Sequence, residues 1–255
     1  MKNSYALVRK DRLMLCLTPL ADPKLVAQWA DDDEVVLKSS ALLTRRQNDE
    51  VTFSLYSTID YSVDRWIQDK QYVPRLLISA VVFTISYFIF SLAVRDPIPM
   101  IDELIISSAL AIVTWRAVAR RDSRSTLAQH RRHRLKAQAS DRRPEIVEGL
   151  FAVEEYLDEM ASQDAYSLSR QLCHVGTARP MELKLSLDEA TVTELTTLLN
   201  LYLARSNRAL LQLSDRVLQA RRQASKAVKL ADHIYHQTMH KGLDIGLLSL
   251  VLALK

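Results

Sequence analysis

Glycine and proline are scarce in this sequence, with 4 Gly and 7 Pro among 255 residues. Loop-rich and all-β proteins need more of both, because tight turns depend on them. Leucine, alanine, arginine, glutamine and glutamate are frequent instead, and these residues favour helices. The composition therefore predicts a mainly helical chain.

Motifs that bind nucleotides or carry out catalysis are also missing. The sequence contains no P-loop, no glycine-rich dinucleotide fingerprint and no Gly-x-Ser-x-Gly motif. Its two cysteines, Cys16 and Cys173, lie too far apart for the short spacings of metal and redox motifs. We expect two reduced thiols facing the cytosol, and we expect neither enzymatic activity nor a cofactor.

One long apolar run stands out against this background. Residues 76–94 carry no charge, and as a helix they extend ~28 Å, close to the ~30 Å thickness of a bilayer core. A second uncharged run, residues 104–115, is long enough only if the helix takes in charged residues at both of its ends. We therefore predict a transmembrane hairpin, with helices at 73–94 and 100–118 and a short extracytoplasmic loop at 95–99.

Positive charge is concentrated beside this hairpin. Between Arg116 and Arg143 there are nine Arg and one Lys against two Asp, a local charge of +8 in a chain whose net charge is +4. Arg65, Lys70 and Arg75 precede the uncharged run of the first helix, whereas the connecting loop contains Arg95 alone. By the positive-inside rule, both flanks and both termini are expected on the cytosolic side of the inner (cell) membrane.

The segment after the hairpin, residues 119–143, is predicted to continue the second helix into the cytosol as an Arg-rich juxtamembrane helix. Anionic lipid headgroups are the favoured partner, at ~1 kcal/mol for each basic residue near the surface. Nucleic acid is less favoured, because no aromatic residues are interleaved for base stacking. The residues expected to contact headgroups are Arg116, Arg120, Arg121, Arg124, Arg131 and Arg132.

Residues 1–58 are predicted to form a small β-rich cytosolic domain. The patterns indicate a short helix at 22–30 and four strands, at 5–8, 13–17, 35–43 and 51–58. The strand at 51–58 is predicted from its alternation of apolar and polar side chains. So small a sheet has a modest core, so it should pack on another subunit or on the C-terminal helices. Residues 59–72 are predicted to form an interfacial amphipathic helix.

Residues 144–255 are predicted to form a helical cytosolic domain, and a coiled coil is one arrangement that its helices could adopt. Pro144 should open its first helix, and residues 183–187 alternate like a short strand. Residues 188–241 should form one long amphipathic helix, or two with a break near 204–208. Uninterrupted, this helix would run ~80 Å and need a partner along its length, which favours self-association. The apolar tail, residues 243–254, has three open destinations: a groove of its own domain, the membrane surface or a partner protein.

Two clusters of polar residues suggest site chemistry. Asp96, Asp102 and Glu103 would form an acidic ring at the outer mouth of any central pore in an oligomer, and such rings attract cations. The second cluster consists of three histidines that share one side of a predicted helix: His233, His236 and His240. These side chains could hold a transition metal, but a polar helix face is the simpler interpretation.

Together these features predict a mainly α membrane protein of the α+β type: a two-helix transmembrane hairpin, a small N-terminal β-rich domain and a C-terminal domain of long helices. The favoured function is that of a membrane-anchored, homo-oligomeric assembly or scaffold protein. It would act by self-association and by recruiting a cytosolic protein partner. The alternative is an oligomeric pore or ion-conducting effector, gated by the cytosolic domain. A metal-dependent enzyme is the least favoured interpretation.

Overall fold

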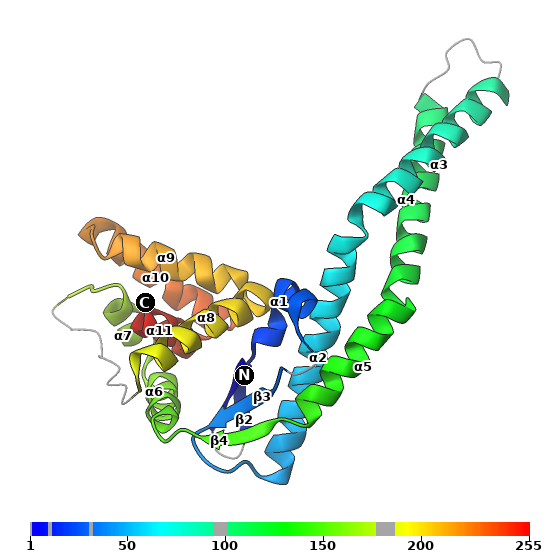
Figure 1. The fold of residues 1–255 in the computed structure, drawn as a ribbon. Coiled ribbons are helices and arrows are strands. Elements are labelled where there is room, and N and C mark those ends of the chain that lie inside the picture. The colour runs from blue at the N-terminus through cyan, green and yellow to red at the C-terminus, as the bar shows by residue number, and fades with distance from the viewer. Residues whose placement is uncertain (1, 10–11, 31–32, 94–100, 177–186) are drawn as a thin grey trace. The chain divides into compact units, whose positions relative to one another are not determined.

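The protein is described by a computed structural model that covers residues 2–9, 12–30, 33–93, 101–176 and 187–255. The chain is mainly helical and carries one small sheet (Figure 1). It divides into two compact units, which we call the sheet–bundle unit (residues 1–21, 30–56 and 138–255) and the hairpin unit (22–29 and 57–137). The N-terminal sheet and the C-terminal helices therefore share one unit.

The sheet contains β1 (Lys2–Arg9), β2 (Arg12–Leu17), β3 (Val35–Ser39) and β4 (Arg143–Ile146), in the order β2-β1-β3-β4. β1 and β2 form the predicted antiparallel hairpin, whereas β3 runs parallel to both β1 and β4. The third strand also lies where the sequence predicted it, although it ends earlier. The central β1 is buried along its middle, as expected for a strand covered on both faces.

The strand predicted at 51–58 is wrong, because these residues lie inside the helix α2 (Arg45–Lys70). α2 begins with a capping box, in which Thr44 Oγ1 accepts from the Gln47 amide at 3.4 Å and Gln47 Oε1 accepts from the Thr44 amide at 2.7 Å. Val51 and Leu55 are buried one turn apart, while Phe53 is 78% exposed. The predicted interfacial helix at 59–72 is likewise the last part of α2 rather than a separate element.

The segment around Pro144 is the strand β4, not the start of a helix. Pro144 pairs with Leu37 at the edge of the sheet. Proline cannot donate a ladder hydrogen bond, so an edge strand is where a sheet tolerates it.

In the described residues of the C-terminal part, 143–176 and 187–255, six helices pack with the sheet around one core. They are α6 (Leu150–Ser162), α7 (Ala165–Leu172), α8 (Glu189–Ser206), α9 (Arg208–Ala220), α10 (Ala224–Lys241) and α11 (Ile245–Leu254). α6 packs on β1 and α8 packs on β2. Of the predicted strand at 183–187, all but the last residue lies outside the described residues.

The single long helix predicted at 188–241 is wrong, since the stretch forms α8, α9 and α10. The break near 204–208 is confirmed, where Asn207 caps α9 by accepting from the Leu210 amide at 3.1 Å. A second break separates α9 from α10. α9 and α10 pack on each other, so each covers part of the other's apolar surface. The uninterrupted helix of ~80 Å that would need a partner along its length is therefore not formed.

The apolar tail is the helix α11, and it docks in its own unit. It contacts α6, α7, α8 and α9, and its residues from Ile245 to Leu252 are buried. Asp244 caps its first turn by accepting from the Leu247 amide at 2.9 Å. A helix that is apolar on all sides must be surrounded, and here the bundle surrounds it.

The hairpin unit contains α1 (Pro23–Gln28), the last part of α2, α3 (Tyr72–Ala93), α4 (Ile101–Ser123) and most of α5 (Thr126–Ser140). The short helix predicted at 22–30 is confirmed as α1. The continuous helix predicted from 100 through 143 is interrupted after Ser123, and Ser125 then accepts from the Ala128 amide at 3.3 Å. The loop at 95–99, with Asp96, lies outside the described residues.

Glu154 connects three parts of the sheet–bundle unit. Its carboxylate, on α6, accepts from the Val8 amide at 2.7 Å and from the Ser40 hydroxyl at 2.7 Å, and its side chain is buried. Burial raises the pKa of Glu154, and the two hydrogen bonds oppose this rise. The folded protein therefore holds the proton more tightly than the unfolded chain does. The contribution of Glu154 to stability is fully present below the ordinary pKa of 4.5 and is lost as pH rises through the folded-state value.

We expect Glu154→Gln to stabilise the sheet–bundle unit at pH 7, by on the order of 1 kcal/mol. Glutamine is uncharged, can still accept from Val8 and can donate to Ser40. The difference in unfolding free energy between variant and parent should grow as pH rises from 4.5 to 7. Denaturant unfolding at several pH values measures this difference. A difference that stays constant with pH would contradict the argument.

Candidate functional site: an apolar helical pair with a basic end

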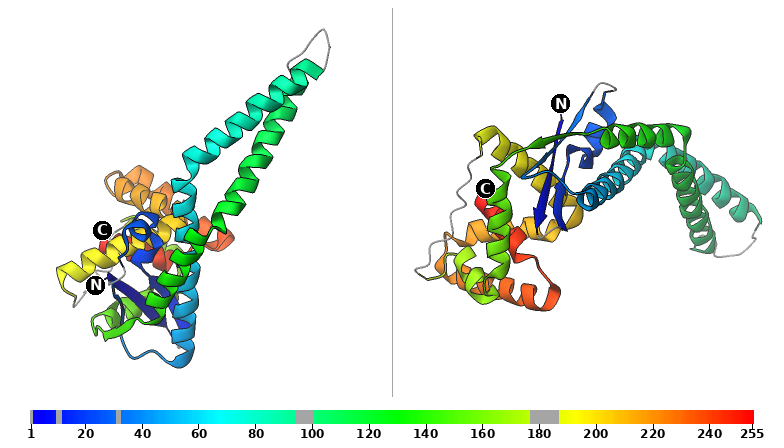
Figure 2. Two further views of the ribbon diagram at one scale, coloured as in Figure 1. Left: turned by 45° about the vertical axis from the view of Figure 1, so that its right-hand side comes forward. Right: turned by 90° about the horizontal axis from the view of Figure 1, so that it is seen from below.

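α3 and α4 lie side by side along their length (Figures 1 and 2). They are antiparallel, because residues at the start of α3 contact residues near the end of α4. Ser79 on α3 and Ser107 on α4 are buried, and side chains this small allow two helices to approach closely. Within the described part of the chain, α3 is the one helix long and apolar enough to cross a membrane, over Tyr72–Leu92.

Both helices present large apolar side chains outward. In the most apolar 18-residue stretch of α3, only 11% is buried, whereas the core helix of a soluble protein is mostly buried. Soluble monomers rarely expose an apolar patch beyond a few hundred Å². The exposed apolar residues are Tyr72, Val73, Leu76, Leu77, Ile78, Val81, Ile85, Phe88, Ile89 and Leu92 on α3, and Ile101, Leu104, Ile105, Ile106, Leu110, Ile112 and Val113 on α4.

An aromatic pair marks one end of this apolar surface. Tyr72 and Trp115 meet edge to face, with ring centroids 5.5 Å apart. Beside them lies a hollow of about 520 Å³ whose lining includes four arginines: Arg65, Arg75, Arg116 and Arg120. Asp69 also lines it. Guanidinium groups match the geometry of phosphate oxygens, so this end of the helical pair can bind phosphate-bearing molecules.

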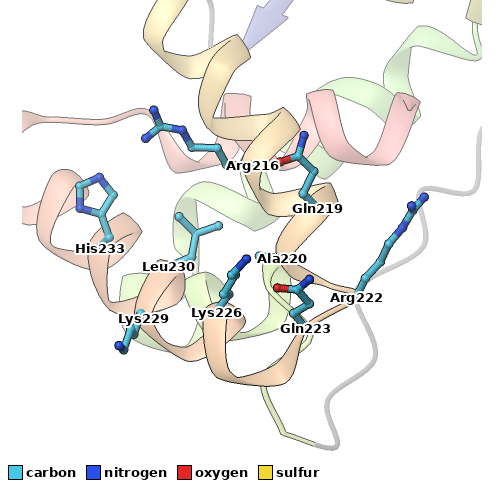
Figure 3. Close-up of a pocket in the computed structure, with 9 residues that line it drawn as sticks. All are labelled: Arg216, Gln219, Ala220, Arg222, Gln223, Lys226, Lys229, Leu230 and His233. Carbon is cyan, nitrogen blue, oxygen red and sulfur yellow. The ribbon is translucent and has the colours of Figure 1, made fainter.

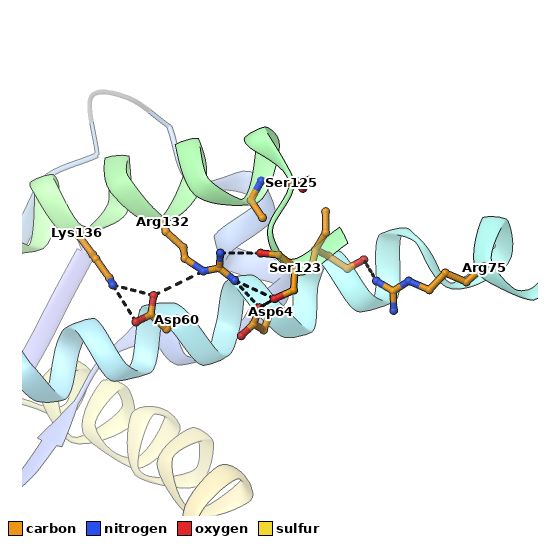
Figure 4. Close-up of polar contacts among 9 residues, drawn as sticks. Asp60, Asp64, Arg75, Ser123, Ser125, Arg132 and Lys136 are labelled. Carbon is orange, nitrogen blue, oxygen red and sulfur yellow. Dashed lines mark hydrogen bonds and ion pairs between the residues drawn. The ribbon is translucent and has the colours of Figure 1, made fainter. Parts of the chain in front are cut away.

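A buried ion pair fastens the same end. Arg75 on α3 is 3% exposed, and its Nε donates to Asp122 Oδ2 on α4 at 2.6 Å (Figure 4). Its guanidinium also reaches the Ile67 carbonyl oxygen, at 3.4 Å. Because a charge buried this deeply needs a partner, Asp122 holds the start of α3 against the end of α4. Sequence reasoning missed this pair, although Asp122 is one of only two acids in the Arg-rich segment.

A second network ties α5 to α2. Arg132 donates to Asp64 at 2.5 Å, Ser123 donates to the same carboxylate at 2.6 Å, and Lys136 pairs with Asp60 at 2.8 Å (Figure 4). Arg131 donates to the carbonyl oxygens of Val26 and Ala27 and lies over the Trp66 ring. Arg131 and Arg132 were predicted to contact headgroups, but both are engaged inside the hairpin unit. Their charges serve to hold its helices together.

The other predicted headgroup contacts keep their charges available, since Arg116, Arg120, Arg121 and Arg124 are all exposed. The acidic cluster is divided instead. Asp102 is exposed and Glu103 is 3% exposed at the side of α4 that also buries Ser107. The two carboxylates therefore lie on different faces of α4.

The histidine face does not form a metal centre. Within the described residues, no three His, Cys, Asp or Glu side chains are placed to hold a metal ion. His236 and His240 stack with ring centroids 5.9 Å apart, and His233 lies 3.4 Å from the Gln237 side chain. These three histidines are surface residues of α10.

Comparisons of the chain with known protein families, with curated proteins and with solved structures find no match.

Proposed function

We propose that this protein is a membrane-anchored assembly protein, in which α3 and α4 cross the inner membrane as a hairpin. The observation that supports this most directly is the outward apolar surface shared by the two helices. In water so large a surface is unfavourable, at roughly 25 cal/mol for each Å² left exposed, whereas lipid tails would solvate it. The sheet–bundle unit would then lie in the cytosol.

The charges at the ends of α4 fit this proposal. Asp102 and Glu103 occupy its first turn, where the helix dipole favours acids and where the headgroup region begins. Arg116 and Arg120 lie at the other end, and their long side chains can reach the headgroups. With these charged ends placed in the two headgroup regions, α4 would be long enough to cross alongside α3.

Anionic phospholipid headgroups are the proposed ligand of the arginine-lined hollow at the inner end. Tyr72 and Trp115 supply the aromatic character typical of membrane interfaces. Arg65, Arg116 and Arg120 supply charge for a phosphate, while Arg75 is already paired with Asp122.

We propose that the protein acts by position and binding rather than by turnover. The sheet–bundle unit would recruit a cytosolic protein partner. Self-association would come from the helical pair, because α8 and α9 pack on each other and on α11, while α10 packs on α7 and α9. Light scattering of the detergent-purified chain should therefore give a defined oligomer, and cytosolic-side variants such as Phe151→Asp should leave its size unchanged.

Cysteine labelling tests the topology. Cys16 and Cys173 are buried, and burial raises the pKa of each thiol to about 11, so neither should react in the folded protein. We expect Ile101→Cys to react with a membrane-impermeant maleimide added to intact cells. Phe151→Cys should react only after the membrane is opened. Reaction of both cysteines before opening, or of Phe151→Cys alone, would overturn the proposed orientation.

A conductance measurement separates anchoring from the pore hypothesis. The two described acids of the predicted ring lie on different faces of α4, so no observation favours a pore. Liposomes that contain the purified chain should show no ion current above the background of empty liposomes. A current that Asp102→Asn with Glu103→Gln abolishes would replace the anchoring proposal.

A further inference from the structure

A second basic hollow lies in the sheet–bundle unit, between α9 and α10. It has a volume of about 660 Å³, and nine residues line it (Figure 3). Arg216 and Gln219 extend from α9, while Lys226, Leu230 and His233 extend from α10 (Figure 3). Its size falls within the range of small-molecule sites.

Four of the lining residues are cations, and none is an acid. The cations are Arg216, Arg222, Lys226 and Lys229, and His233 stands beside them. Among the described residues, no carboxylate lies within 4.0 Å of any of the four nitrogen-bearing groups. Other cations of this unit are paired, such as Lys38 with Glu145 and Lys255 with Asp215. All four are exposed, so solvent screens them, but their like charges around one hollow create a positive potential that favours binding of an anion.

The start of α10 adds to the positive potential. α10 has 18 residues, and its N-cap, Gln223, makes no side-chain hydrogen bond to the first turn. The backbone N–H groups of that turn therefore have no side-chain acceptor from the cap, and the helix dipole places partial positive charge at the hollow. Lys226 lies in this turn. Side-chain cations and a helix N-terminus in one place are the arrangement that phosphate groups recognise.

We propose that the α9–α10 hollow binds a small molecule with two or more linked phosphate groups. A single phosphate would leave most of the four cations uncompensated. Leu230 and Ala220 provide an apolar surface that could receive a ring attached to the phosphates, as in a nucleoside triphosphate. A nucleic acid strand fits less well, since no Phe, Tyr or Trp lines the hollow for base stacking. The site is independent of the membrane proposal, because it lies wholly within the sheet–bundle unit.

Isothermal titration of the detergent-purified full chain tests this site, with inorganic tripolyphosphate and ATP as separate probes at 150 mM salt. We expect both probes to bind, and inorganic phosphate to bind at least tenfold more weakly. Lys226→Gln with Lys229→Gln should weaken binding at least about tenfold, since charged hydrogen bonds are lost. Arg216→Gln with Arg222→Gln should do the same. Tighter binding of ATP than of tripolyphosphate would identify the nucleotide as the preferred source of the phosphates.

The matched control removes two exposed cations elsewhere in the unit, as Arg208→Gln with Lys241→Gln. It changes the net charge equally, so it should alter binding less than twofold. Equal weakening in the control would show nonspecific attraction and overturn the site. The proposal also fails if neither probe binds at 1 mM, or if a single-stranded oligonucleotide binds more tightly and depends on the same four residues. One double variant alters α10 and the other alters α9 and the turn that follows it, so one that misfolds leaves the other to decide.

Discussion

Replacing Ile85 by aspartate is expected to release the chain from the membrane fraction. Ile85 lies in the middle of α3 and is 54% exposed, so in the proposed hairpin it faces lipid. An ionised carboxylate at the centre of a spanning helix costs about 2.5–3.5 kcal/mol, which lowers insertion by roughly two orders of magnitude. The fraction of chain that resists alkaline carbonate extraction measures the effect.

The direction of this result distinguishes two environments for α3. If α3 lay in water, aspartate at an exposed apolar position would raise solubility and leave fractionation unchanged. The control is Phe151→Asp, which places the same charge at a position that is 61% exposed on α6. It should leave the chain in the membrane. If the Ile85 variant still resists extraction as the parent does, the lipid-facing role of α3 is wrong.

Local signals in the sequence predicted several elements correctly. The β1–β2 pair, β3 and α1 lie where the sequence predicted strands and a short helix. The apolar run at 76–94 predicted α3, because a long uncharged stretch has few stable structures other than a helix. Each of these elements is decided by neighbouring residues, so a pattern of ten to twenty residues is enough to find it.

The elements that were assigned wrongly are those in which a short pattern is compatible with more than one type of secondary structure. Val51 and Leu55 match both alternation and a helical repeat, and the Thr44–Gln47 capping box decides in favour of the helix. Pro144 is compatible with a helix start and with an edge strand, and pairing with the distant β3 decides. The end of α9 carries neither Gly nor Pro, so its boundary depends on packing rather than on sequence punctuation.

The site residues likewise fall into those that the sequence alone could predict and those that it could not. The exposed arginines at and just beyond the end of α4 could be predicted as a basic flank from charge counting alone. The pairing of Arg75 with Asp122, 47 positions apart, could not, because it depends on how α3 and α4 align. The α9–α10 hollow was missed for the same reason, since its lining residues are brought around one hollow only where α9 and α10 pack on each other.

Asp122→Asn is expected to loosen the hairpin unit by about 3 kcal/mol. Asparagine retains one hydrogen-bond acceptor for Arg75 but removes the negative charge. Arg75 is 3% exposed, so its guanidinium would be left buried with no charged partner. Amide hydrogen exchange of the detergent-solubilised protein should become faster in the first turns of α3 and the last turns of α4. Asp102→Asn, an exposed acid at the opposite end of α4, is the control and should change exchange little.

A double variant tests whether the loss comes from the unpaired charge or from the missing contact. In Arg75→Met with Asp122→Leu, no charge remains to be buried, and two apolar side chains can fill the space. Replacing a buried ion pair with apolar groups is often neutral or stabilising. We therefore expect exchange in the double variant to return close to that of the parent, although Asp122→Asn alone accelerates it. If the double variant exchanges as fast as the single one, Arg75 and Asp122 hold the helices by specific hydrogen bonds, and charge burial is not the dominant effect. If Asp122→Asn leaves exchange unchanged, the ion pair does not fasten α3 to α4 at all.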